Sequence, residues 1–109
     1  MPEEIDLNAA HSLKDELAKL KKEEWHSPIN LGHGVNTGNK SAQRRFARRL
    51  KLMQIPNDLT GKKVLDIGAW DGYFSFEFER RGAKVLATDL WSEEAFANFL
   101  FAKKNWTAR

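Results

Sequence analysis

The 109-residue sequence contains no cysteine, which excludes a disulfide framework, a thiolate metal site and a thiol nucleophile. Only three histidines are available as imidazole ligands, so a zinc site is not expected. No apolar run reaches the ~18 to 20 residues that cross a bilayer. The opening MPEEIDLNAA lacks the basic start and the apolar middle of a signal peptide. We therefore expect a cytoplasmic protein without a metal site.

The remaining composition is typical of one small globular domain. Hydrophobic residues make up 41% of the chain and charged residues 30%, and the formal net charge is +3. A chain of this length favours a single domain with a small core. The net charge is too modest to indicate a nucleic-acid-binding protein by itself.

The N-terminal segment predicts an amphipathic helix over about residues 9–24. Either Asp6 or Asn8 is a suitable N-cap, because a short polar side chain can accept a bond from the first helical N–H groups. The apolar positions at helical spacing are Leu13, Leu17 and Leu20.

A second helix is predicted over about residues 41–53, with Ser41 as its cap and Pro56 as a stop beyond its end. Its apolar positions are Phe46, Leu50 and Met53. Between the two helices, HSPINLGHGVNTGNKS is rich in glycine and asparagine and carries a proline. This composition predicts a long loop.

The C-terminal half predicts a strand-helix-strand unit. Short apolar runs near residues 63–67 and 84–88 have the character of buried strands, and YFSFEFERRG between them predicts a helix that closes on a glycine. A last helix is predicted from Ser92, with two glutamates in its first turn. Parallel strands joined by a right-handed helical crossover follow, which makes the fold class α/β.

The stretch VLDIGAWDGYF joins the first predicted strand to its helix. It places Asp66 near the end of the strand, and Gly68 and Gly72 in the turn. In open α/β sheets this position forms the ligand crevice, because the helix N-terminus directs unpaired N–H groups beyond the strand ends. A nucleoside also needs an acidic side chain at the end of the next strand, which accepts hydrogen bonds from ribose hydroxyls. Asp89 ends that strand, so both halves of a nucleoside site are present.

The glycine spacing argues against a dinucleotide cofactor. A G-x-G-x-x-G fingerprint that starts at Gly68 needs glycine where this sequence has Trp70 and Tyr73. The pattern instead resembles motif I of class I S-adenosylmethionine-dependent methyltransferases, acidic-x-Gly-x-Gly-x-Gly, with Trp70 in place of the middle glycine. The run GKKVLDIGAWDGYFSFEFERRGAKVLATDL also resembles the opening of that fold, and the likeness covers residues 61 to about 105.

The resemblance implies a partial Rossmann-like methyltransferase fold, in which helices precede a β-α-β-α unit that is the first half of a doubly wound parallel sheet. Residues 1–58 would form an N-terminal helical and loop extension, and residues 59–109 the first half of the S-adenosylmethionine-binding domain. The implied activity is methyl transfer to an unidentified acceptor, with no catalytic residue assigned. Upstream, WHSPINLGHGVNTG is similar to a segment found in a bacterial branch related to tRNA wobble-uridine-modifying methyltransferases.

The same resemblance assigns cofactor contacts to both strand ends. Asp66 would meet the amino group of S-adenosylmethionine directly or through water, Asp89 would hold the ribose, and Leu90 would lie near the adenine. The main chain of residues 68–70 would lie against the methionine part, where glycine permits close approach. The implied cofactor-binding residues are Asp66, Gly68, Ala69, Trp70, Gly72, Asp89 and Leu90.

Each feature also has a structural interpretation. The glycine turn is also compatible with a plain strand-helix connection, although an acid inside a buried strand needs a partner, which favours a function for Asp66. Trp25, His26 and His33 are more often packed or loop residues, and a substrate-facing role for them rests on the resemblance alone. The residues interpreted as core rather than as a stacking platform are Tyr73, Phe74, Phe76 and Phe78.

The basic run QRRFARRLK leaves a second function open. It is most simply a solvated helix face, and the alternative is RNA phosphate binding. The arginines concerned are Arg44, Arg45, Arg48 and Arg49. The competing functional hypothesis is therefore a non-catalytic nucleoside-binding or RNA-binding module.

Two predicted strands are few for a doubly wound sheet. A two-stranded parallel sheet exposes apolar faces and unpaired edges to water. We therefore expect either a fragment of a longer methyltransferase or a homo-oligomer. The large apolar side chains of the last segment that would need cover are Phe96, Phe99, Phe101 and Trp106.

Overall fold

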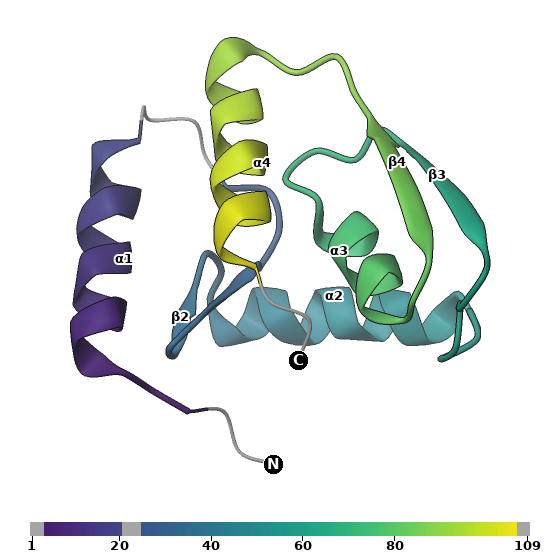
Figure 1. The fold of residues 1–109 in the computed structure, drawn as a ribbon, viewed down its shortest axis with the longest axis horizontal. Helices are drawn as coiled ribbons and strands as arrows, with labels where there is room; N and C mark the ends of the chain where they lie inside the picture. The colour runs from purple at the N-terminus through teal and green to yellow at the C-terminus, as the bar shows by residue number, and fades with distance from the viewer. Residues whose placement is uncertain (1–3, 21–24, 107–109) are drawn as a thin grey trace.

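The computed structural model describes residues 4–20 and 25–106 (Figure 1). This part of the chain has a mixed α/β architecture, with four helices, an antiparallel hairpin and a small parallel sheet. Its elements are α1 (Leu7–Lys19), β1 (Asn30–Gly32), β2 (Val35–Asn36), α2 (Lys40–Leu52), β3 (Lys63–Ile67), α3 (Tyr73–Arg80), β4 (Lys84–Thr88) and α4 (Glu93–Asn105). Figure 1 shows α1 at one end of the molecule, the parallel sheet at the other, and α2 along the lower edge.

Helix α1 begins at the predicted cap. The Asp6 carboxylate accepts hydrogen bonds from the backbone N–H groups of Asn8 and Ala9, at 2.9 and 3.2 Å, which satisfies two donors that a helix start leaves unpaired. The helix ends at Lys19, earlier than the predicted range of 9–24. Residues 21–24 of that prediction lie outside the described residues.

The predicted loop between the first two helices contains a short hairpin, so this part of the prediction was wrong. Strands β1 and β2 pair antiparallel across a two-residue turn. His33 and Gly34 in the turn have φ of 51° and 78°, a left-handed pair that suits the twist of a tight hairpin. The strands are three and two residues long, too short to show an alternating pattern in the sequence.

Asn39, rather than the predicted Ser41, caps α2. The Asn39 side-chain oxygen accepts a hydrogen bond from the backbone N–H of Ala42 at 2.8 Å. Ser41 lies inside the first turn, where its hydroxyl accepts a bond from Arg45 Nη1 at 2.8 Å. The helix therefore begins one residue before the predicted range of 41–53.

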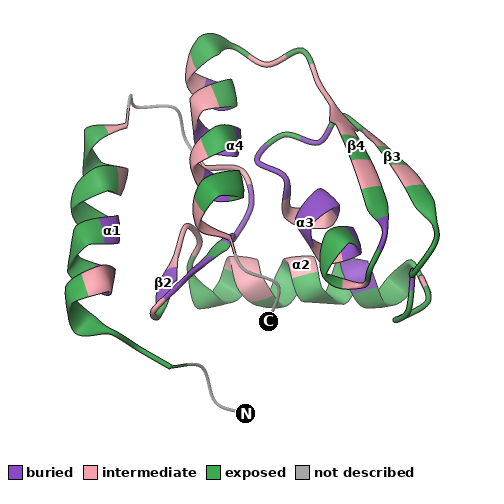
Figure 2. Ribbon diagram, in the orientation of Figure 1, coloured by how far each residue is buried: buried purple, intermediate pink, exposed green. Residues whose placement is uncertain are grey.

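The parallel sheet matches the strand-helix-strand prediction. β3 pairs with β4 in register from Lys63 opposite Lys84 to Ile67 opposite Thr88, and α3 forms the crossover and packs against one face. The other face stays open to solvent (Figure 2). On it, the exposed fractions of Leu65, Ile67 and Leu86 are 58%, 78% and 64%. This confirms the expectation of an apolar sheet face in contact with water.

The N-terminal and C-terminal segments, predicted to divide between residues 58 and 59, share their cores. In one cluster Ile29 and Leu31 pack with Phe76 and Phe99. In a second cluster Leu50 packs with residues that follow the predicted boundary, Leu59, Phe78 and Ala83. Among the aromatic residues expected in the core, Phe76 and Phe78 are buried, and Tyr73 and Phe74 are half-buried.

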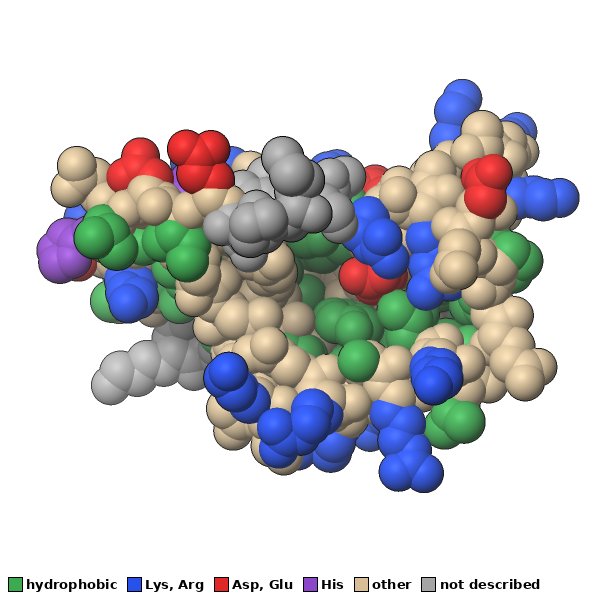
Figure 3. All heavy atoms as spheres, turned by 90° about the horizontal axis from the view of Figure 1, so that it is seen from below, with side chains coloured by type: hydrophobic (Ala, Val, Ile, Leu, Met, Phe, Trp, Pro, Cys, Tyr) green, Lys and Arg blue, Asp and Glu red, His purple; other side chains and the backbone are tan. Residues whose placement is uncertain are grey.

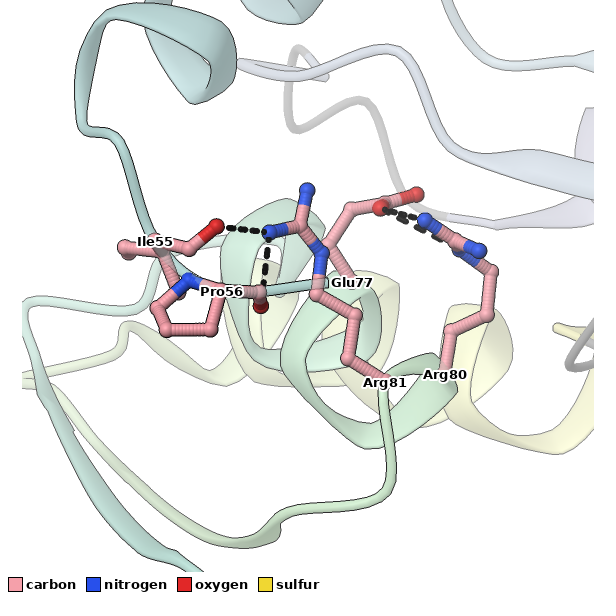
Figure 4. Close-up of polar contacts among 5 residues, drawn as sticks. All are labelled: Ile55, Pro56, Glu77, Arg80 and Arg81. Atoms are coloured by element: carbon pink, nitrogen blue, oxygen red, sulfur yellow. Dashed lines mark hydrogen bonds and ion pairs between the residues drawn. The ribbon is translucent and has the colours of Figure 1, made fainter. Parts of the chain in front are cut away.

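Arg81 joins the two segments at the end of α3. Its Nη1 donates to the carbonyl oxygens of Ile55 and Pro56, at 2.9 and 3.2 Å (Figure 4). The neighbouring Arg80 instead pairs with Glu77 one turn earlier, at 2.9 Å. The chain that leaves α2 is thus fixed beside the helix that follows β3.

Candidate functional site

The loop between β3 and α3 is fastened to the end of β4 by backbone hydrogen bonds. The N–H groups of Gly68 and Ala69 both donate to the Thr88 carbonyl oxygen, at 2.8 and 3.0 Å. The N–H of Gly72 donates to the Ala69 carbonyl oxygen at 2.9 Å, inside the loop itself. These donors are therefore directed into the protein rather than toward a ligand.

Asp89 binds the same loop from the end of β4. Its Oδ2 accepts a hydrogen bond from the Trp70 N–H at 2.7 Å, and its Oδ1 accepts one from the Leu90 N–H at 2.6 Å. An ionised carboxylate offers about four lone-pair sites, so each oxygen retains acceptor capacity. The structure thus brings the predicted glycine loop and the predicted ribose-binding acid into direct contact.

A hollow of about 420 Å³ lies beyond the strand ends. Its lining residues are Ile67, Gly68, Thr88, Asp89 and Leu90. Gly68 has φ of 77°, and a Cβ built on it would meet no atom within 4 Å. The backbone at Gly68 is therefore open to close approach by a ligand, and Leu90 beside it is fully exposed.

Four of the predicted cofactor residues do not line this hollow, namely Trp70, which is described below, and the following three. Asp66 is half-buried and accepts a hydrogen bond from the Ser75 hydroxyl of α3 at 2.6 Å, which supplies the partner that an acid in this strand needs. Ala69 is buried. Gly72 is buried with φ of 101°, and a Cβ there would lie 2.7 Å from the Phe76 ring. Gly72 therefore allows the Phe76 ring to pack directly against the start of α3. Cofactor contacts of Asp66, Ala69 and Gly72 stay predictions.

Trp70 takes the place of the middle glycine in a glycine-like backbone conformation. Its φ is 52°, in the left-handed region that residues other than glycine occupy infrequently. The Trp91 indole N–H donates to the Trp70 carbonyl oxygen at 2.7 Å, so both sides of this residue's backbone are held. The His26 ring stacks on the Trp70 ring, with centroids 4.2 Å apart and planes inclined by 8°.

Asp71 is a residue of this loop that the sequence did not single out. It is 1% exposed, and its Oδ2 accepts bonds from the N–H of His26 and from the N–H and hydroxyl of Ser27. Burial raises the pKa of Asp71 above its ordinary value, although the bonds from Ser27 and His26 act in the opposite direction. The donors lie 44 and 45 positions earlier in the chain, so no local pattern could have indicated this contact.

The structure places Trp25, His26 and His33 in three different environments. Trp25 packs against the larger hydrophobic cluster. His33 lies in the hairpin turn and accepts a bond from the Asp6 N–H at 3.1 Å, whereas His26 reaches the glycine loop. In the described ranges, no group of three or more His, Asp or Glu side chains is arranged to hold a metal ion.

The basic residues of α2 form a surface away from the glycine loop. Lysine and arginine side chains stand out on the face seen from the α2 side (Figure 3). The exposed arginines of this helix are Arg44, Arg45, Arg48 and Arg49. None of the described helices is long and apolar enough to span a membrane.

Comparison with known proteins gives a short methyltransferase match. The chain is 44% identical over 43 residues to a magnesium-protoporphyrin O-methyltransferase from Rhodobacter capsulatus. The match covers 39% of this chain and 19% of that protein, so it supports a methyltransferase relationship at most. No family model matches the sequence, and no solved structure matches it.

Proposed function

We propose that this chain binds S-adenosylmethionine in the hollow at the ends of β3 and β4 and takes part in methyl transfer. The observation that carries the proposal is the contact between the Trp70 N–H and Asp89 Oδ2. It joins the glycine loop to the acidic residue at the carboxyl end of a neighbouring parallel strand, the position where open α/β sheets bind ligands. The short methyltransferase likeness supports the same class of reaction.

The hydrogen bonds of the loop favour a ligand without a pyrophosphate. A dinucleotide site offers free backbone N–H groups to phosphate oxygens at the helix start. Here the N–H groups of Gly68, Ala69, Trp70 and Gly72 already donate to oxygen atoms of the protein. A nucleoside whose other end carries a sulfonium and an amino acid group does not require those donors.

The lining of the hollow fits a nucleoside. Asp89 retains acceptor sites on both oxygens for ribose hydroxyls, Gly68 leaves room for close contact, and Leu90 offers an apolar surface for a base. The volume of about 420 Å³ lies within the usual range for small-molecule sites. We interpret the β-α-β-α part as the first half of a doubly wound methyltransferase sheet.

S-adenosylmethionine, when bound, would supply a methyl group activated by its positively charged sulfur, and in-line attack of an acceptor on that methyl carbon would release S-adenosylhomocysteine. The contribution of this chain is to bind and orient. Asp89 would fix the ribose, and the backbone at Gly68 would set the approach of the methionine part.

Calorimetric titration with S-adenosylhomocysteine tests the proposal. Titration of the wild-type protein should give a heat signal that fits one binding site. Asp89→Ala should weaken binding by about 10- to 100-fold, since hydrogen bonds to a charged acceptor contribute ~1.5–3 kcal/mol. Asp15→Ala, an exposed acid on α1, is the matched control and should bind as wild type. Absence of binding by wild type at millimolar ligand, or unchanged affinity in Asp89→Ala, would contradict the proposal.

A non-catalytic nucleoside-binding or RNA-binding module is the second candidate. Among the residues that line the hollow, Asp89 is the acidic one, and its carboxylate already accepts hydrogen bonds from two backbone N–H groups. A lining of this kind favours binding of a nucleoside without catalysis. Binding of S-adenosylhomocysteine without methyl transfer from labelled S-adenosylmethionine to RNA, protein or small-molecule extracts would favour this module over the enzyme.

A further inference from the structure

We propose that Asp71 is a positioning residue, which holds the segment of residues 25–27 against the glycine loop so that His26 stacks on Trp70, whose backbone N–H is bound by Asp89 of the cofactor site. This inference rests on the proposed function, because the stacked pair of His26 and Trp70 matters for binding only if a cofactor binds beside Asp89. It assigns a role in binding to a carboxylate that is itself buried away from the hollow.

The first step is the anchor itself. A single carboxylate oxygen of Asp71 receives three donors, the N–H groups of His26 and Ser27 and the Ser27 hydroxyl. Hydrogen bonds to a charged acceptor are about twice as strong as neutral ones, and a buried carboxylate without them would be costly. The position of the 25–27 segment is therefore tied to one side chain of the loop.

The second step is what the anchor presents. Because Asp71 fixes the backbone of His26, the His26 ring lies flat on Trp70, the residue immediately before Asp71. The Trp70 side chain is 56% exposed, so this pair lies at the surface rather than in a core. Packing alone does not require an ordered stack at such a place.

The third step is the link to the cofactor site. The backbone of Trp70 is held from two further sides, by Asp89 Oδ2 at its N–H and by the Trp91 indole at its carbonyl. Asp89 and the neighbouring Leu90 line the hollow. A shift of the 25–27 segment would therefore act on Trp70 and through it on the carboxylate that is proposed to hold the ribose.

The stacked pair can be observed without any ligand. A ring stacked 4.2 Å above an indole experiences its ring current, so the carbon-bound protons of His26 should resonate upfield of those of His11, which is exposed on α1. Asp71→Asn keeps the size of the side chain and removes its charge. We expect the His26 signals to move toward those of His11 in this variant, whereas Asp58→Ala, which removes an acid that accepts a bond from the Thr60 N–H two residues later, should leave them in place.

The link to binding is tested by titration with S-adenosylhomocysteine. Asp71→Asn and His26→Ala should each weaken binding by about 3- to 10-fold, and His26→Phe, which restores a stacking ring, should return affinity to within about twofold of wild type. Asp58→Ala should bind as wild type. If Asp71→Asn does not fold, the Ala and Phe variants of His26 decide, because both leave the anchor intact.

The outcomes separate the two proposals. Wild type that fails to bind S-adenosylhomocysteine overturns the proposed function, and the His26 proton shifts still decide whether Asp71 positions the rings. Wild type that binds, with unchanged affinity in Asp71→Asn and His26→Ala, overturns the positioning role and leaves the proposed function standing. Unchanged His26 signals in Asp71→Asn also overturn it.

Discussion

Replacing Trp70 by glycine or by alanine should reverse the usual order of stability of these two residues. In most backbone conformations a protein with glycine at a given position is less stable than one with alanine by about 0.5–1 kcal/mol, because glycine loses more conformational freedom on folding. Trp70 has φ of 52°, where the Cβ of any L-residue costs roughly 1–2 kcal/mol and glycine has no such penalty. Trp70→Gly should therefore unfold with a free energy about 1 kcal/mol higher than Trp70→Ala.

The comparison isolates the backbone because both variants lose the same side-chain contact. The stack on His26, worth about 0.5–1.5 kcal/mol, is absent from each of them, so both should be less stable than wild type or close to it. Urea unfolding followed by far-ultraviolet circular dichroism gives the two free energies. Ala47→Gly, at an exposed interior position of α2, is the control and should cost about 1 kcal/mol in the ordinary direction. If Trp70→Ala is at least as stable as Trp70→Gly, the left-handed conformation at this residue is refuted.

Burial raises the pKa of Asp71, so between the ordinary carboxyl pKa of about 3.9 and the raised value the folded state binds more protons than the unfolded state. The contribution of Asp71 to the free energy of unfolding should therefore increase as pH falls through this window. Urea unfolding of wild type and Asp71→Asn should show the increase in wild type alone. His26, which faces Asp71, is present in both proteins, and equal pH dependence would contradict the assignment. The basic face of α2 gives a separate prediction, in which tRNA affinity falls steeply with salt and the slope flattens by about 0.7–0.9 for each phosphate contact removed. The test variant has glutamine in place of Arg44, Arg45, Arg48 and Arg49. If its salt dependence of tRNA binding has the wild-type slope, this face of α2 is an ordinary solvated surface.

The helices and the parallel strands could be predicted because their signals are local. Asp6 was one of two candidate caps for α1, and the structure selects it. The strand predictions near 63–67 and 84–88 match β3 and β4, since short apolar runs beside glycine turns identify strands without tertiary information. The hairpin was missed because its turn is made by His33 and Gly34, a pair without the usual asparagine-glycine signal.

In the candidate site, too, local features could be predicted from the sequence and long-range contacts could not. Gly68 and Asp89 could be placed from sequence, because parallel strands bring their carboxyl ends to one edge of a sheet. The contacts of Asp71 and the stack of His26 on Trp70 join segments more than 40 residues apart, and nothing in the sequence specifies which N-terminal residues reach the loop. The left-handed backbone at Trp70 is likewise set by its partners Asp89 and Trp91, not by the tryptophan itself.

The open face of the parallel sheet leads to the last prediction, that the purified 109-residue chain associates in solution. Leu65, Ile67 and Leu86 are each more than half exposed on this face, and full burial of such a side chain contributes about 1.5–3 kcal/mol. Covering the remaining exposed area of all three would contribute on the order of 3–6 kcal/mol per chain, or about 6–12 kcal/mol for the two chains of a dimer. This range includes the ~8 kcal/mol that corresponds to association at micromolar concentration. Sedimentation velocity should show a mass that rises with concentration, and Leu65→Thr with Leu86→Thr, which places β-branched residues in the strands, should reduce it. A cooperative, well-folded monomer at all concentrations would show that the helices close the core unaided.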